Sequence, residues 1–252
     1  QIIKDTFEEE SERRENLLRM YHYFEERMVV APASGKPNYH NCYVGGYIEH
    51  VLHVTETAKK LMKVYQEIDG VIDFTEEELV FSALHHDLGK VGDLEHEYYI
   101  PQEDDWRRKK LNEYFTQNPE MKYMSVTDRA LWLLQHFDVK VSQMEYLAIK
   151  CSDGMYDDSN KQYLKTFKPE NSFQTSLPYI IHWADHMATT VEFDEWKLGD
   201  KDEKEEVESR IENIKSVTVE KDKQNGGPQK HKDPVLENKH KDLFEELFGD
   251  KS

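Results

Sequence analysis

The sequence contains few cysteines, no long apolar run and a deficit of positive charge. Its two cysteines, Cys42 and Cys151, are too few for a disulfide framework and favour a reducing, cytoplasmic setting. No segment approaches the roughly 18 apolar residues of a membrane span, and the start QIIKDTFEEESERR lacks the basic and then apolar pattern of a signal peptide. We therefore expect no membrane association. The net charge of −18 disfavours sequence-independent wrapping of duplex nucleic acid.

Helical periodicity runs through most of the chain. Apolar residues recur at helical spacing in the segments 5–28, 47–65, 75–88, 128–139, 142–152 and 177–196. No strand-like alternation of any length appears, nor any repeat at a fixed period. With 252 residues and 12% aromatic side chains, the chain can build a sizeable core. We expect an all-α domain.

The composition changes near residue 198. Residues 198–252 are mostly charged and are interrupted by GGP, so we expect a charged, flexible linker or tail after a domain of residues 1–197. The segment KDLFEELFGD, residues 241–250, is expected to form a short amphipathic anchor from Leu243, Phe244, Leu247 and Phe248. Such an anchor suits docking into a groove of a partner protein, and it equally suits folding back onto the parent domain.

A histidine and an aspartate stand side by side at the end of one predicted helix. Thr75, followed by three glutamates, marks the start of that helix, and Gly89 is expected to end it in a left-handed conformation. His86 and Asp87 therefore lie at its C-terminus, where an imidazole and a carboxylate can bind one divalent metal ion. Lys90 follows in the turn, where it can meet an anionic substrate.

Two further ligand candidates lie on other predicted helices. His50 is near the start of the segment 47–65, and Asp185 lies on the segment 177–196, on one face with His182 and His186. Two imidazoles and two carboxylates leave positions open on a metal ion that prefers five or six ligands, so water and a phosphate oxygen can both enter.

The four candidates follow the order His, His-Asp, Asp. In this order, and with GGYIEH, ALHHDLGK and HWADHMA around them, residues 38–195 resemble the HD-domain superfamily of metal-dependent phosphohydrolases. GGYIEH is similar to the GGLLEH stretch in the HD domain of some bacterial 3′ to 5′ exoribonucleases. The resemblance implies an HD-type helical bundle whose divalent metal ligands are His50, His86, Asp87 and Asp185. Mn, Fe, Mg, Co, Ni and Zn are not distinguished by the sequence.

The resemblance also implies an activity. The chain is expected to cleave a phosphoester or phosphoanhydride bond of a nucleotide or nucleic acid by attack of a metal-activated water, with Asp87 and Lys90 as catalytic residues. A second metal ion has two candidate ligands, His136 and Asp153. Asp153 stands where many members of the superfamily have a histidine before the glycine, and this departure argues against a second ion.

Substrate contacts are expected from Lys90 and from a basic cluster in an acidic protein. Arg107 and Arg108 follow Trp106, so the cluster can hold a phosphate and stack a base of a nucleotide or single-stranded nucleic acid. An ordinary solvated helix face is the alternative interpretation. Other histidines are expected to pack around the site, namely His53, His85 and His182, while His40 could line the cleft and His186 is a further candidate for reaching the metal.

A non-catalytic adaptor is the alternative function. KDLFEELFGD resembles the C-terminal peptides by which phage polymerases and bacterial replication proteins dock on sliding clamps, and the domain looks like HD proteins of large tailed phages. That similarity implies a sliding-clamp-like partner for residues 241–250 and a location in the host cytoplasm. An adaptor need not keep all four ligand candidates, so their presence favours an enzyme.

Overall fold

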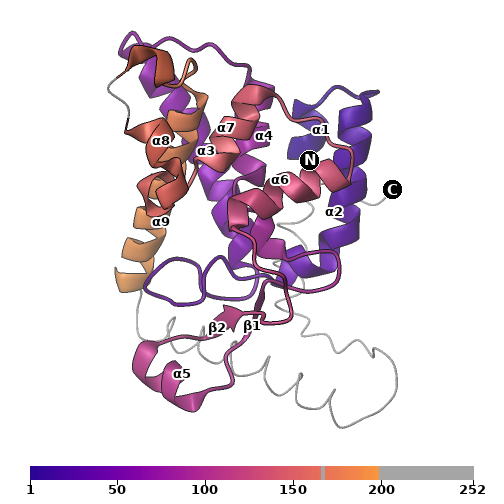
Figure 1. The fold of residues 1–252 in the computed structure, drawn as a ribbon, viewed down its shortest axis with the longest axis vertical. Coiled ribbons are helices and arrows are strands. Elements are labelled where there is room, and N and C mark those ends of the chain that lie inside the picture. Colours follow the sequence, from indigo (N-terminus) through magenta and orange to yellow (C-terminus); the bar gives the residue numbers. More distant parts are fainter. Residues whose placement is uncertain (166–167, 199–252) are drawn as a thin grey trace.

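The computed structural model describes residues 1–165 and 168–198. In these residues the chain is mostly helical (Figure 1). Its elements are, in order, α1 (Ile2–Thr6), α2 (Glu12–Val30), α3 (Gly46–Glu67), α4 (Glu76–His85), η1 (Leu88–Val91), β1 (Tyr99–Pro101), α5 (Asp105–Leu111), β2 (Phe115–Gln117), α6 (Val126–His136), α7 (Gln143–Lys150), η2 (Gly154–Tyr156), η3 (Asp158–Asn160), α8 (Lys161–Leu164), η4 (Pro169–Asn171) and α9 (Leu177–Leu198). The predicted all-α class is confirmed as a mostly helical fold. The linker and anchor expected in residues 199–252 lie outside the described residues.

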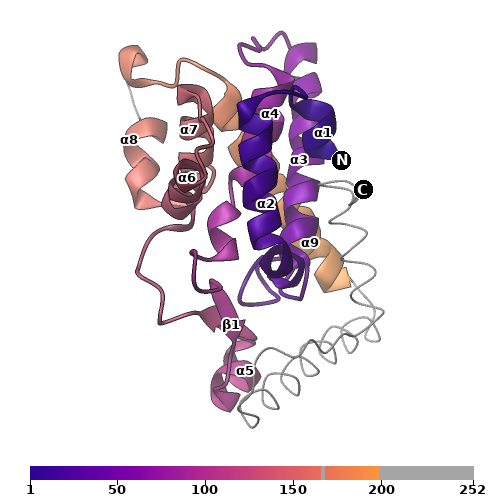
Figure 2. The same ribbon diagram turned by 90° about the vertical axis from the view of Figure 1, so that its right-hand side faces the viewer.

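Helix α3 packs against α9, α4 and α2, while α7 packs on α9 and α4. Figure 2 shows α6, α7 and α8 on one side of the molecule and α1 and α3 on the other. None of the helices in the described ranges combines the length and apolar character that a membrane crossing requires.

Small side chains line the contact between α3, α4, α7 and α9. This part of the core contains the fully buried residues Ala58, Ala83, Ala148, Ala184 and Ala188. Because the distance between two packed helices depends on the side chains at their contact, alanines allow these four helices to approach closely. Polar side chains from α3, α4 and α9 can therefore meet. Larger residues, such as Phe24, Phe81 and Leu133, fill the second part of the core between α2, α4 and α6.

The N-terminal helix differs from the prediction. Instead of one helix over residues 5–28, α1 ends at Thr6 and α2 begins at Glu12. The hydroxyl of Ser11 accepts a hydrogen bond from the backbone N–H of Arg14, which caps α2 at its start. The apolar periodicity of the segment is helical on both sides of this break, so the pattern alone did not reveal it.

Helix α4 begins as predicted, with a capping box between Thr75 and Glu78. The role expected for Gly89 was wrong. Gly89 lies inside η1 and is not left-handed; instead, a Cβ on Gly89 would lie 2.1 Å from the carbonyl oxygen of Val126. Glycine is needed there because the turn after His86 and Asp87 presses against the start of α6.

Residues 93–128 contain two short strands that the sequence did not reveal. β1 and β2 pair antiparallel, with Ile100 opposite Thr116, and α5 connects them. The backbone N–H groups of Tyr114 and Phe115 donate to the carbonyl oxygen of Gly35, so this unit is attached to the loop before α3. Both views show the strands and α5 at one end of the helical bundle (Figures 1 and 2).

We expect Ala184→Leu to lower the free energy of unfolding by about 1–3 kcal/mol, because extra methylenes in a close-packed core force neighbouring side chains or helices apart. Urea denaturation followed by circular dichroism measures the change. The matched control is Thr190→Leu, at an exposed position of α9, which should change stability by less than about 0.5 kcal/mol. Equal effects of the two substitutions would contradict the close packing of α9.

Candidate metal centre

Three helices bring the four predicted ligands together. His50 lies on the buried face of α3, His86 caps the C-terminus of α4, Asp87 directly precedes η1, and Asp185 lies on α9. His50 and His86 are completely or almost completely buried, and Asp87 is 5% exposed. The packing of α3 on α4 and α9 thus brings residues that are far apart in the sequence together in one cluster.

The polar atoms of the cluster lie within contact distance of one another. Nε2 of His50 is 3.2 Å from Oδ1 of Asp185 and 3.5 Å from Oδ2 of Asp87. Nε2 of His86 is 3.6 Å from each of the same two oxygen atoms. Two nitrogen and two oxygen atoms from four side chains therefore converge on one small volume, and such a group of atoms could hold a divalent ion.

Both Nε2 atoms are buried and have no hydrogen-bond partner, although carboxylate oxygens are close. The other ring nitrogens are occupied: Nδ1 of His86 is 2.7 Å from the carbonyl oxygen of Ala83, and Nδ1 of His50 is 3.0 Å from Oε2 of Glu192. If each Nδ1 carries the proton, each Nε2 presents a lone pair to the cluster. Buried polar atoms are normally paired, so these two nitrogens fit a metal ion.

Glu192 is a residue of this site that the sequence reasoning missed. Its side chain is buried, and its two oxygens accept from Nδ1 of His50 and from Nδ1 of His53, the latter at 2.9 Å. Burial disfavours the charged form, but the two histidines outweigh burial and lower the pKa of Glu192 to about 2. Its position seven residues after Asp185, two turns along α9, was the available signal.

Lys90 lies beside the cluster, and its predicted contact with an anionic substrate stays a prediction. Its Nζ is 2.6 Å from Oδ2 of Asp87, and the side chain is largely buried. Burial disfavours the ammonium ion, but Asp87 outweighs burial and raises the pKa of Lys90, which stays cationic. Burial disfavours the charged form of Asp87, but the ammonium group of Lys90 and the imidazoles of His86 and His50 outweigh it and hold the pKa of Asp87 below its ordinary value.

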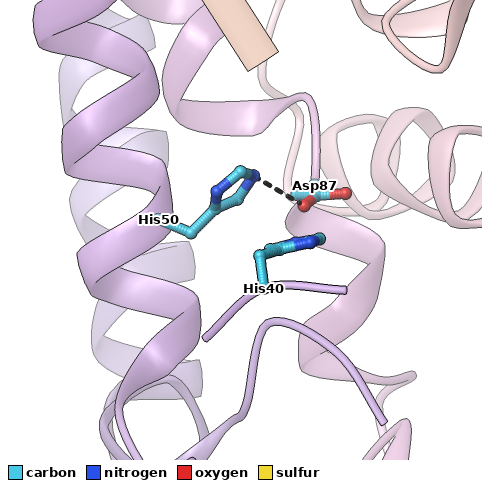
Figure 3. A group of neighbouring side chains, drawn as sticks. All are labelled: His40, His50 and Asp87. Atoms are coloured by element: carbon cyan, nitrogen blue, oxygen red, sulfur yellow. Dashed lines mark ion pairs between the residues drawn. The ribbon is translucent and has the colours of Figure 1, made fainter. Parts of the chain in front are cut away.

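His40, considered only as a residue lining the cleft, reaches the cluster directly. Figure 3 shows His40, His50 and Asp87 turned toward one another from the loop, from α3 and from the turn after α4. The ring centroids of His40 and His50 are 4.5 Å apart, and Nε2 of His40 is 3.5 Å from Nζ of Lys90. Burial, with His50 and Lys90 nearby, lowers the pKa of His40 to about 3, so the ring is neutral.

Asp153, a candidate ligand of a second ion, lies close enough to the cluster for the charges of Asp87 and Asp185 to shift its pKa. Burial, followed by the negative charges of Asp87 and Asp185, raises its pKa to about 6. Behind it, a Cβ on Gly154 would lie 2.1 Å from the ring of His182, so this turn packs tightly against α9. His182 packs as expected, with Nδ1 2.7 Å from the carbonyl oxygen of Ser152.

The structure does not bring His136, the other candidate ligand of a second ion, to these residues. The ring of His136 is exposed at the end of α6, against Trp132 and Phe137. His85, expected to pack rather than bind metal, is fully buried, and its two ring nitrogens contact the hydroxyl of Tyr21 and the carbonyl oxygen of Phe81.

The basic cluster on α5 makes local contacts. Arg107 pairs with Glu113 at 3.0 Å and Arg108 pairs with Asp105, while Trp106 is exposed. Helix α5 lies at the end of the molecule beyond β1 and β2 (Figure 1). Substrate binding by these residues stays a prediction.

Opposite charges shift the pKa values inside the cluster. Burial disfavours the charged form of His50, but the carboxylates of Asp185 and Glu192 outweigh it and raise the pKa of His50 to about 10. The pKa of His86 is raised as well, because Asp87 and Asp185 outweigh burial. In return, the imidazoles hold the pKa of Asp185 well below its ordinary value in spite of burial. A divalent ion bound to these residues would therefore compete with protons for the site.

No family model, curated protein or solved structure matches the chain. Function is therefore inferred from the cluster itself. Its buried His and Asp groups could hold a metal ion, with the ligating atoms of His50, His86 and Asp185 all within 4.8 Å of one another. Beside them stands the buried ammonium group of Lys90, 2.6 Å from Oδ2 of Asp87.

In the presence of a chelator, we expect the free energy of unfolding to fall as the pH rises above neutrality. The pKa of His50 is about 10 in the folded chain against 6.5 when exposed, so its protonated ring stabilises the fold fully below pH 6.5 and this contribution is lost as the pH rises toward 10. Urea denaturation over that range measures the slope. The variant His50→Gln should show a flatter dependence, and an unchanged slope in the variant would contradict the pairing of His50 with Asp185 and Glu192.

Proposed function

We propose that this protein is a metal-dependent phosphohydrolase. The observation that carries the proposal is the pair of buried Nε2 atoms, on His50 and His86, which lack hydrogen-bond partners and converge with the carboxylates of Asp87 and Asp185. More narrowly, we propose that it is a member of the HD-domain superfamily, whose order of ligands it follows in a helical bundle. The bond cleaved is a phosphoester or phosphoanhydride of a nucleotide or nucleic acid.

His50, His86, Asp87 and Asp185 would hold the metal ion. A divalent ion bound by such ligands lowers the pKa of a coordinated water and neutralises negative charge on a phosphate. The two imidazoles and two carboxylates match a hard or borderline divalent cation, and four protein ligands would leave positions open on an ion that prefers five or six. The donor set does not select one metal.

Lys90 supports phosphate chemistry in particular. Its buried ammonium group contacts Asp87 at 2.6 Å and remains cationic, so it can hold a phosphate oxygen without an added proton. Nε2 of His40 lies 3.5 Å from the same Nζ, on a neutral ring that can donate or accept a hydrogen bond. Together they offer one positive charge and one neutral polar group next to the ligands.

Burial limits the approach of substrate. Of the four ligands, Asp185 has the most exposed side chain, at 18%, whereas those of His50, His86 and Asp87 are 0%, 1% and 7% exposed. We therefore propose that the phosphate enters beside Asp185, between α9 and the turn that carries Asp153. A mononucleotide or the end of a single strand fits such an approach better than the middle of a duplex.

Metal analysis of the purified protein, followed by hydrolysis of ribonucleotides, deoxyribonucleotides and short oligonucleotides with added manganese or magnesium, tests the proposal. Bound metal with release of phosphate, nucleoside or mononucleotide would support it and name the substrate class. A protein that binds no divalent ion under any of these conditions would refute it.

The substitution Asp87→Asn should reduce hydrolysis to background and abolish tight metal binding, because the amide of asparagine carries no charge for the ion or for Lys90. Helical content measured by circular dichroism should be unchanged, since the side chain keeps its size. Asp194→Asn, at an exposed position of α9, is the matched control and should leave both properties intact. Hydrolysis by Asp87→Asn at the wild-type rate would remove Asp87 from the site.

A further inference from the structure

Glu192 is a buried carboxylate held by two histidines of one helix. Its oxygens lie 3.0 Å from Nδ1 of His50 and 2.9 Å from Nδ1 of His53, and the residue is 4% exposed. His50 and His53 are one turn apart on α3, so both rings reach the same acid on α9. Burying a carboxylate is costly unless it is well hydrogen-bonded. Each of the two oxygens of Glu192 has a histidine Nδ1 as its partner, so the buried carboxylate is fully hydrogen-bonded.

Helix α9 contacts both ring nitrogens of His50. Asp185 lies 3.2 Å from Nε2, and Glu192, two turns further along the same face, lies 3.0 Å from Nδ1. A neutral imidazole carries only one N–H. When Nδ1–H donates to Glu192, Nε2 must present its lone pair toward Asp185, Asp87 and His86. The ring can neither flip nor exchange its proton between nitrogens without losing the contact with Glu192.

We propose that Glu192 is a positioning residue of the metal centre, which fixes the orientation and tautomer of His50 and raises the basicity of its Nε2. The proposal rests on the metal site of the proposed function, but it concerns the binding of the ion and not the hydrolysis. His53 completes the contact from the solvent side: its side chain is 31% exposed, and it occupies the second oxygen of Glu192. A carboxylate or carbonyl behind a ligating histidine orients the ring and increases its affinity for the ion.

The test is the dissociation constant of Mn²⁺, measured by isothermal titration calorimetry on the chelator-treated full chain. Glu192→Gln keeps the size and an acceptor oxygen but removes the charge, and Glu192→Leu removes both. We expect Mn²⁺ to bind about 10-fold more weakly to the first variant and about 100-fold more weakly to the second, the range found for such outer contacts. Glu192→Asp, which keeps the charge on a shorter side chain, should recover part of the affinity.

Two control variants separate positioning from a general effect on charge or packing. Glu195→Gln removes an exposed acid from α9 and should leave the dissociation constant unchanged. His53→Ala removes the other histidine while His50 keeps its contact, so the affinity should change by less than about threefold. Thermal unfolding in a chelator checks that each variant folds.

The ring of His50 provides a readout that a purely structural role would not change. In Zn²⁺-loaded protein, nitrogen-15 spectra of the histidine rings should show His50 protonated at Nδ1 and bound through Nε2. This Nδ1 proton should be protected from exchange in wild type and lose its protection in Glu192→Leu. Wild-type Mn²⁺ affinity in Glu192→Gln and Glu192→Leu, with an unchanged His50 spectrum, would overturn the proposal.

Failure of this inference can be told apart from failure of the proposed function, because the Mn²⁺ titration measures metal binding alone, without any substrate. Weakened Mn²⁺ binding in the Glu192 variants upholds the inference even if the wild type hydrolyses no phosphate ester. Conversely, hydrolysis by a wild type whose Glu192 variants bind Mn²⁺ normally leaves the function standing and removes Glu192 from its role. A wild-type chain that binds no divalent ion overturns both.

Discussion

The contact of His50 with Asp185 and Asp87 is the constraint on which the rest of this structure depends. Nε2 of His50 lies 3.2 Å and 3.5 Å from oxygens of these two residues, in a region from which water is largely excluded. Ionisable groups buried in this way are costly unless each finds an opposite charge or a hydrogen bond. The helices α3, α4 and α9 must therefore keep their relative positions closely, and the alanines between them permit the required approach.

Contacts outside the cluster support the turn after α4 and the loop before α3. The guanidinium group of Arg129 donates to the carbonyl oxygen of Gly89, and Gly89 itself abuts Val126, so α6 supports the turn that carries Asp87 and Lys90. In the loop before α3, the carbonyl oxygen of His40 accepts from the hydroxyl of Ser34, which helps to fix the loop that places the ring of His40 beside that of His50. Both hydrogen bonds run from a side chain to a backbone carbonyl oxygen, so they hold the backbone of the turn and of the loop in place.

The chemistry of the cluster follows from its charges. Three carboxylates, those of Asp87, Asp185 and Glu192, surround two imidazoles and one lysine. With both histidines neutral, as ligands must be, the carboxylates exceed the lysine by two negative charges, which one divalent cation would balance. The proposed hydrolase would use this cation and Lys90 to bind an anionic substrate, and the proposed role of Glu192 would explain why a third carboxylate is buried behind the four candidate ligands.

Local patterns in the sequence were enough to predict most helices and the helix start at Thr75, because periodicity and capping depend on residues a few positions apart. The four residues that the structure gathers were predicted from their order and from the resemblance of the surrounding motifs to the HD-domain superfamily. Tertiary contacts decided the rest. Glu192 and His40 joined the cluster and His136 stayed at the surface, since these outcomes depend on how helices and loops distant in sequence pack. The break before Glu12, the strands β1 and β2, and the close approach that requires Gly89 likewise arise from contacts with other segments, which no single stretch of sequence displays.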